Sequence, residues 1–179
     1  MQEIKDQQGR SIFIVDNVLT VSEHNYLYNS ILRSNFNIGF EDTEAIERLS
    51  NKYLHIVWNP TVLKECGFID ALKNTEIWNI ISDLEVKRII INLSVPSDTY
   101  YPHCHKDELA LIYYANMDWK PEWGGETIFF EENLQDIVYA SLYKPGRLIL
   151  ADGNIPHTIR SQSDLAPHYR FSLAMFFKK

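Results

Sequence analysis

The hydrophobic pattern divides the chain into a first part of mixed texture and a second part made of short strands. After residue 86, segments rich in β-branched and aromatic residues alternate with breaks at Pro, Gly and polar residues. The segments that we expect to be strands are 86–95, 108–117, 125–132, 136–143, 147–152, 157–161 and 170–177. Short strands at such spacing favour a β-sandwich or a small barrel.

The first part mixes strands with helices. Residues 11–19 are rich in β-branched side chains and predict a strand, after which Thr20 and Glu23 have the spacing of a capping box. The helix that follows should end near Ser34. It would place four residues on one apolar side, namely Tyr26, Leu27, Ile31 and Leu32.

Further along, residues 41–50 fit either a short helix or an acidic loop, and residues 52–60 predict a strand that Pro60 stops. Residues 64–82 have helical periodicity with an irregular middle, which predicts a second amphipathic helix. Such helices would brace a sheet. We therefore expect one domain over residues 1–179, mainly β, in which 1–85 supports a double-stranded β-helix, or jelly roll, formed by 86–179.

Composition and charge narrow the class of protein. The chain has 179 residues, of which 45% are hydrophobic, and no apolar run is long enough to cross a bilayer. The first ten residues lack the apolar stretch of a signal peptide, and Cys66 and Cys104 form no disulfide framework, so we expect a cytoplasmic protein. A net charge of −7 argues against broad nucleic-acid binding.

The segment "HCHKD" at residues 103–107 offers candidate metal ligands. On a continuous strand His103, His105 and Asp107 would project to one side, whereas a break near residue 106 leaves only His105 and Asp107 to converge. With the distant His157, that pair would form a facial triad of two histidines and one carboxylate, which suits non-haem Fe(II).

Two other interpretations of these residues stay open. His103, His105 and His157 together would suit zinc or a cupin-type site. Alternatively, the same side chains are polar groups on a surface loop, and for any single histidine that interpretation is the stronger one.

The segment "YRFSLAMFF" favours a binding site and argues against the interpretation as a polar surface loop. Arg170 and Ser172 are two residues apart on an apolar strand and therefore face the same side. An arginine that points into an apolar barrel is costly unless it meets an anion. A carboxylate meets this need through a bidentate contact, to which Ser172 can add a hydrogen bond.

The order of "HKD", "LALIYYAN", "GGETIFF", "YKPGRLILADGNIPHTI" and "RFSLAMFF" resembles the 2-oxoglutarate and Fe(II)-dependent dioxygenases of the prolyl 4-hydroxylase type, over residues 86–179. The resemblance implies iron binding by His105, Asp107 and His157. It also implies binding of the cosubstrate by Arg170, Ser172 and Tyr114. The implied cofactors are Fe(II) and 2-oxoglutarate, with O₂ as cosubstrate and ascorbate as an accessory reductant. No catalytic residue is expected beyond the metal ligands.

The resemblance implies hydroxylation of a substrate C–H bond with release of succinate and CO₂. The family-level substrate is a prolyl residue in a peptide or protein, and small molecules are the other class; neither a nucleic acid nor a membrane is expected as partner. A non-catalytic jelly-roll binding module and a cupin-like metalloenzyme are the alternatives. The stretch "LSVPSD" lacks a tyrosine that contacts the cosubstrate in the family, a contact that Tyr100 or Tyr101 could supply. Trp119 and Trp123 would form either a rim around the substrate or a cap on the end of the barrel.

Overall fold

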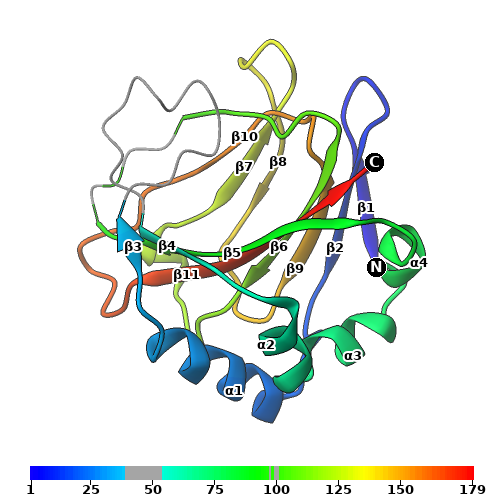
Figure 1. Cartoon of the computed structure of the whole chain (residues 1–179). Coiled ribbons are helices and arrows are strands. Elements are labelled where there is room, and N and C mark those ends of the chain that lie inside the picture. Colours follow the sequence, from blue (N-terminus) through cyan, green and yellow to red (C-terminus); the bar gives the residue numbers. More distant parts are fainter. Residues whose placement is uncertain (39–53, 97, 99–100) are drawn as a thin grey trace.

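Two antiparallel sheets build the molecule. The computed structural model describes residues 1–38, 54–96, 98 and 101–179 (Figure 1). The larger sheet has the strand order β1 (Gln2–Lys5), β2 (Ser11–Val15), β9 (Leu148–Asp152), β6 (Glu108–Tyr114), β11 (Arg170–Lys178), β5 (Val86–Ser94), β4 (Leu54–Val57) and β3 (Asn37–Ile38). The smaller sheet has the order β10 (His157–Ile159), β7 (Thr127–Phe130) and β8 (Ile137–Ser141). This confirms the expected mainly β, jelly-roll architecture, while the assignment of one domain to 1–179 stays a prediction.

Strand β11 lies in the middle of the larger sheet, between β6 and β5. Its side chains alternate between the two faces because the strand period is two. Phe171, Leu173, Met175 and Phe177 belong to the core between the sheet and the helices. Arg170, Ser172, Ala174 and Phe176 line a cavity on the other face. The strand is buried on both faces, which explains its nearly continuous apolar sequence.

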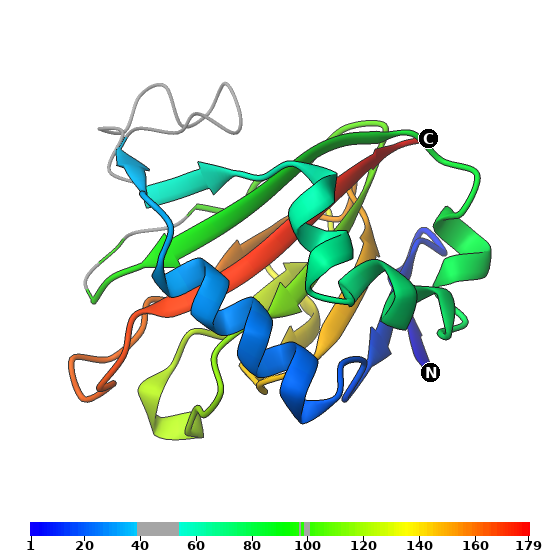
Figure 2. The ribbon, with the colours of Figure 1, turned by 60° about the horizontal axis from the view of Figure 1, so that its bottom comes forward.

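The helices cover one face of the larger sheet (Figure 2). They are α1 (Val21–Leu32), α2 (Pro60–Glu65), α3 (Phe68–Lys73) and α4 (Trp78–Ile81). Their buried side chains, such as Leu27, Leu63 and Phe68, pack against the sheet. Each fully buried side chain of this size contributes about 1.5–3 kcal/mol to folding, so the predicted bracing role is also a large part of the stability.

Helix α1 begins as predicted. Thr20 and Glu23 form the capping box: the Thr20 backbone N–H donates to Glu23 Oε2 (2.8 Å) and the Glu23 N–H donates to Thr20 Oγ1 (3.3 Å). The predicted apolar side is wrong in part, because Tyr26 and Leu32 are 52% and 51% exposed. The buried positions are His24, Leu27 and Ile31, spaced at the helical period. His24 fits this face because its Nε2 donates to the Ala115 carbonyl (2.9 Å).

The single helix predicted over residues 64–82 is instead interrupted. Three short helices, α2, α3 and α4, form in its place, and the first of them begins at residue 60. Gly67, with φ of +76°, separates α2 from α3, a conformation that side chains other than glycine rarely adopt. The segment 41–50, for which a helix or a loop was expected, lies outside the described residues. In the described part of the chain, every helix is too short or too polar to cross a membrane.

Candidate functional site

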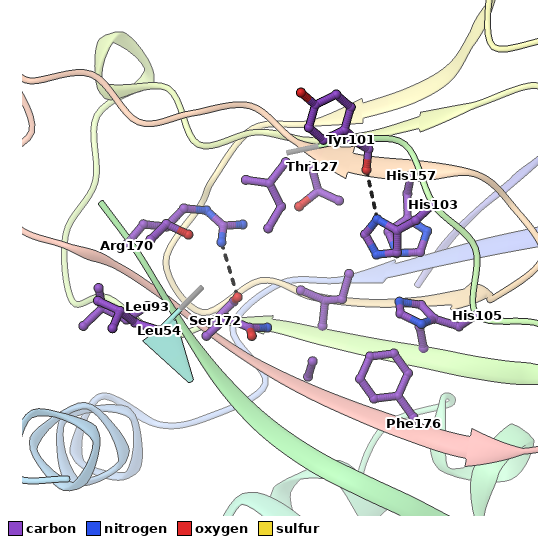
Figure 3. Close-up of a pocket in the computed structure, with 16 residues that line it drawn as sticks. Leu54, Leu93, Tyr101, His103, His105, Thr127, His157, Arg170, Ser172 and Phe176 are labelled. Carbon is purple, nitrogen blue, oxygen red and sulfur yellow. Dashed lines mark hydrogen bonds between the residues drawn. The ribbon is translucent and has the colours of Figure 1, made fainter. Parts of the chain in front are cut away.

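A cavity opens between the two sheets, at the inner face of β5, β6 and β11. Figure 3 shows three histidines toward one end of it and Arg170 with Ser172 toward the other. The remaining lining is mostly apolar between these two polar ends, with Ile112, Ala174 and Phe176 among its members. The full lining consists of Leu54, Asn92, Leu93, Ser94, Tyr101, His103, His105, Ala110, Ile112, Thr127, His157, Ile159, Arg170, Ser172, Ala174 and Phe176.

The histidine end has the geometry of a metal site. The side chains of His103, His105 and His157 offer ligand atoms that all lie within 4.8 Å of one another. Backbone pairing fixes two of them, because His103 and His157 face each other in an antiparallel bridge with N–H···O distances of 3.0 Å in both directions. The His105 N–H donates to the Gly153 carbonyl (2.7 Å), which joins the third histidine to the same loop region.

Hydrogen bonds to the backbone orient two of the rings. His157 Nδ1 lies 2.9 Å from the Ile155 carbonyl and His103 Nδ1 lies 3.0 Å from the Tyr101 carbonyl. A carbonyl only accepts, so each Nδ1 carries the proton and each Nε2 keeps a free lone pair. This is the arrangement by which proteins usually orient metal-binding histidines.

The same surroundings keep the buried rings neutral. Burial, followed by the neighbouring imidazoles of His103 and His105, lowers the pKa of His157 well below 6.5. Burial, followed by His103 and the Arg88 guanidinium, lowers the pKa of His105 to about 3. Neutral imidazole is the form that binds a metal, so the site is ready to bind one at neutral pH.

Asp107, a ligand in the predicted triad, lies apart from this group. Within the described residues, the potential metal-binding group at this place contains His103 and no carboxylate. His103 forms an isolated bridge with His157, and the chain turns after His105, whose carbonyl accepts from the Glu108 N–H (3.2 Å). Asp107 has a φ of +59° in that turn and is exposed. The alternation that would aim Asp107 at the site therefore ends before residue 106, and the residue that lies beside His105 and His157 is His103.

The other end of the cavity holds a buried arginine. Arg170 is 0% exposed, and its Nε donates to the Gly125 carbonyl (2.9 Å) while its Nη1 contacts Ser172 Oγ (3.3 Å). The third nitrogen, Nη2, is buried without a hydrogen-bond partner. No carboxylate in the described part of the chain forms an ion pair with Arg170. A fully buried cation with a free donor is costly unless a ligand supplies an anion.

Aromatic rings hold this arginine in place. The Arg170 guanidinium lies 4.9 Å from the Tyr143 ring and 5.4 Å from the Tyr114 ring, which stack on each other. Tyr114 was predicted to contact a cosubstrate, but it does not line the cavity. Its hydroxyl instead donates to Thr127 Oγ1 (2.8 Å), and Thr127 does line the cavity. Tyr114 therefore supports both Arg170 and Thr127.

The two tryptophans belong to this support. Trp119 packs against Tyr143 with ring centroids 4.7 Å apart, and its Nε1 donates to the Gly124 carbonyl (2.9 Å). Trp123 is buried and packs edge-on against Trp119. Neither tryptophan lines the cavity, and both pack behind its arginine end. Tyr101 does line the cavity and is 44% exposed, whereas Tyr100 lies outside the described residues.

Sequence patterns did not identify several polar groups of the cavity. Ser94 and Asn92 on β5 lie opposite Arg170 and Ser172 on β11 in the strand register, and all four line the cavity. The side chain of Ser94 is buried and its Oγ has no hydrogen-bond partner. The sequence contains one indication of these groups, the alternating polar residues at the end of the strand over 86–95. This pattern points to the cavity only when the pairing of that strand with β11 is known.

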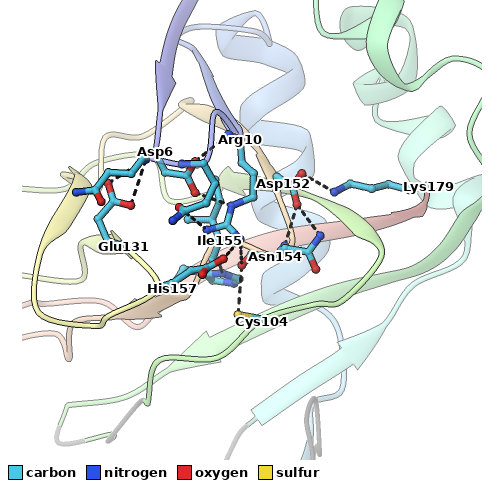
Figure 4. A network of polar contacts seen from close by, with 12 residues as sticks. Asp6, Arg10, Cys104, Glu131, Asp152, Asn154, Ile155, His157 and Lys179 are labelled. Carbon is cyan, nitrogen blue, oxygen red and sulfur yellow. Dashed lines mark hydrogen bonds and ion pairs between the residues drawn. The ribbon is translucent and has the colours of Figure 1, made fainter.

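A polar network stabilises the turn that carries His157 (Figure 4). Arg10 Nη1 donates to the Asn154 carbonyl (3.1 Å), and the Asn154 N–H donates to Asp152 Oδ1 (2.9 Å). Arg10 in turn forms an ion pair with the buried Asp6. The turn between β1 and β2 thus contacts the loop that follows the adjacent strand β9, and so supports the segment that leads to His157.

Comparisons with known proteins agree with this fold. No family model and no curated protein match the chain. Among solved structures, a prolyl-4-hydroxylase from Pseudomonas putida is similar with a TM-score of 0.66 and 17% identity, over 94% of this chain and 92% of that one. The viral collagen prolyl hydroxylase of Paramecium Bursaria Chlorella virus-1, in its 2-oxoglutarate complex, gives 0.62 and 15%, over 94% and 96%.

A third similar structure is HygX from Streptomyces hygroscopicus with nickel and 2-oxoglutarate bound, at a TM-score of 0.68 and 9% identity, over 93% of this chain and 82% of that one. At such identities the likeness concerns the fold. The resemblance noted in the sequence is thus confirmed at the level of three-dimensional structure: the chain has the jelly-roll fold shared by prolyl hydroxylases and other 2-oxoglutarate and Fe(II)-dependent oxygenases.

Proposed function

We propose that this protein is an Fe(II)- and 2-oxoglutarate-dependent dioxygenase that hydroxylates a substrate C–H bond. The observation that carries the proposal is Arg170, a fully buried arginine with an unpaired Nη2 at the end of a cavity whose other end holds converging imidazoles. A structural metal site needs no such arginine. A small dicarboxylate that bridges the two ends would give Arg170 its missing anion.

The residues present fit both groups. Imidazole nitrogens suit Fe(II), and His105 and His157 would hold it at one end of the cavity. Arg170, with Ser172 beside it, would hold the distal carboxylate of 2-oxoglutarate at the other end. When bound, Fe(II) with 2-oxoglutarate and O₂ supplies the oxidation, in which the cosubstrate yields succinate and CO₂ and a substrate carbon gains a hydroxyl group.

The chain itself orients these groups and limits water. The backbone bridge between His103 and His157 fixes the metal end, and the stacked rings of Tyr114 and Tyr143 fix the arginine end. Apolar side chains such as Ile112 line the space between the two ends. In such surroundings Arg170 binds a carboxylate more strongly than it would in water, because the local dielectric constant is low.

For the substrate we propose a prolyl residue in a peptide or protein. Several proteins with this fold are prolyl hydroxylases, and one, from Trichoplax adhaerens, forms a complex with a fragment of a hypoxia-inducible factor degradation domain (TM-score 0.64, 15% identity, over 93% of this chain and 83% of that one). Release of succinate in the presence of proline-containing peptides, compared with free amino acids, tests this choice. We also retain the cytoplasm as the proposed location, since both cysteines are free.

One observation favours a second function. Three imidazoles without a carboxylate also suit zinc, as in a cupin-like metalloenzyme. That function predicts a metal centre whose properties do not respond to 2-oxoglutarate. It leaves the unpaired Arg170 without a role, and for this reason we place it second.

The deciding experiment is an anaerobic titration of the Fe(II)-loaded protein with 2-oxoglutarate, followed by the visible charge-transfer band of a chelated 2-oxo acid. Replacing Arg170 by Ala should weaken cosubstrate binding by about 2 kcal/mol or more, roughly thirtyfold, because a buried charge loses its partner. The matched control is Arg160→Ala, whose side chain is 68% exposed and should not matter. Equal affinities for 2-oxoglutarate in the Arg170→Ala and unmodified proteins would contradict the proposal.

A further inference from the structure

We propose that His103, and not Asp107, is the third metal ligand, so that three neutral imidazoles hold the metal. The inference rests on the proposed function only in that a divalent metal binds in this cavity. It assigns His103 a role in the site and departs from the pattern of two histidines and one carboxylate that the sequence suggested.

The position of His103 supports this assignment. It lies directly opposite His157, and the two backbones exchange both hydrogen bonds at 3.0 Å. Its ring centroid is 4.6 Å from that of His157 and 4.9 Å from that of His105. The three rings come from two segments of chain, which the bridge holds at a fixed separation. A side-chain movement is therefore not needed to gather the ligand atoms.

The ring of His103 is also turned correctly. Its Nδ1 donates to the Tyr101 carbonyl, so Nε2 is the nitrogen with a lone pair, and the residue lines the cavity. His157 has the corresponding arrangement through the Ile155 carbonyl. Two histidines whose rings are oriented by backbone carbonyls, on segments joined by a backbone bridge, are typical of a built metal site.

The position of Asp107 argues against it as a ligand. Its left-handed backbone (φ +59°) belongs to the turn that ends the histidine segment, and its side chain is exposed. Its carbonyl accepts from the Lys179 N–H (3.1 Å), which ties this residue to the rim of the larger sheet beyond β11. Moving the carboxylate into the cavity would require this turn to open.

An all-imidazole site has a consequence for charge. A carboxylate ligand would cancel one of the two positive charges of the metal, whereas three imidazoles cancel none. The Arg88 guanidinium, whose Nη2 lies 3.4 Å from His105 Nδ1, forms an ion pair with Glu108 (2.9 Å), so this pair adds no net charge beside the site. Anions should therefore bind to the open positions of the metal more tightly than in a site with one carboxylate ligand.

The test uses Co(II) as the probe, titrated into the metal-free full chain and followed by its visible absorption. His103→Ala should lower the Co(II) affinity at least about tenfold, because mutation of a residue that only supports a metal ligand already costs about that much. Asp107→Asn should leave the affinity unchanged, since asparagine tolerates the same backbone conformation. Thermal unfolding of each metal-free variant separates lost ligation from lost folding.

A second variant, His103→Asp, tests the charge. It should recover the Co(II) binding lost in His103→Ala, but bind azide at the metal at least about tenfold more weakly than the unmodified protein. Loss of Co(II) binding in Asp107→Asn with retention in His103→Ala would overturn the assignment. So would absence of Co(II) binding in the unmodified protein, and equal azide affinities would overturn the conclusion about charge. None of these measurements involves 2-oxoglutarate, whose binding tests the proposed function separately.

Discussion

Gly125 should be required for the position of Arg170, and a comparison with Gly9 isolates the reason. Both glycines have left-handed backbones, with φ of +81° and +80°. An added Cβ at Gly125 would lie 3.0 Å from Arg170 Cδ and 3.2 Å from Nε, whereas one at Gly9 would have no heavy atom within 4 Å. Substitution by alanine therefore places a side chain at a similar positive φ at both positions, but displaces Arg170 only at the first.

The magnitudes follow from these contacts. The left-handed conformation costs an alanine about 1–2 kcal/mol, which both variants should lose. Gly125→Ala should also weaken the bond from Arg170 Nε to the Gly125 carbonyl, and a hydrogen bond with a charged donor contributes about 1.5–3 kcal/mol. We expect Gly125→Ala to lower the free energy of unfolding by about 2 kcal/mol more than Gly9→Ala does.

The assay is chemical denaturation of both variants without metal or cosubstrate, followed by the 2-oxoglutarate titration. Gly125→Ala should reduce cosubstrate affinity at least about tenfold, because a displaced guanidinium no longer presents its donors in the right geometry. Gly9→Ala should leave this affinity unchanged. If the two variants lose equal stability and bind 2-oxoglutarate equally, the close contact between Gly125 and Arg170 has no energetic importance and the reasoning fails.

Three further predictions concern stability. Thr20→Ala removes the capping box and should cost about 1 kcal/mol in a denaturant titration, while Ser22→Ala, in the same turn, should cost little. The hydrogen bond from Arg147 to Asp16, assisted by Lys144, lowers the pKa of Asp16 from 3.8 to about 2. The contribution of Asp16 to the free energy of unfolding is therefore full above about pH 4 and disappears as the pH falls through 2. The stabilities of Asp16→Asn and the unmodified protein should converge over that range in unfolding curves, and a constant difference would contradict this. Co(II) at a hundred times its dissociation constant should stabilise the folded protein by about 2.7 kcal/mol, measured as a rise in the unfolding temperature that is absent in His157→Ala.

The strands were predictable because their pattern is local. Alternation and turn residues placed each strand from 86 to 178 correctly, and the capping box placed the start of α1. The outer side of α1 was not predictable, since the exposure of Tyr26 and Leu32 depends on which side of the helix meets the sheet. The break at Gly67 was visible only as irregular periodicity.

The candidate site was predictable in its residue types and only in part in its geometry. The alternation on β11 correctly placed Arg170 and Ser172 on one face. Which of His103 and Asp107 lies beside His105 and His157 depended on where the extended segment ends, and the turn at 106–107 contains no glycine or proline to indicate it. The contact between Tyr114 and Thr127 depends on how the two sheets face each other, which no local pattern records.

The place of β11 has a consequence during synthesis of the protein. This strand lies between β6 and β5, so these two strands lack the strand that joins them until residues 170–178 have left the ribosome. Until then β5 and β6 expose edges and apolar faces, a state in which aggregation competes with folding. Loss of the segment after residue 169 would therefore remove the middle of the sheet, together with Arg170 and Ser172, and leave two separate halves.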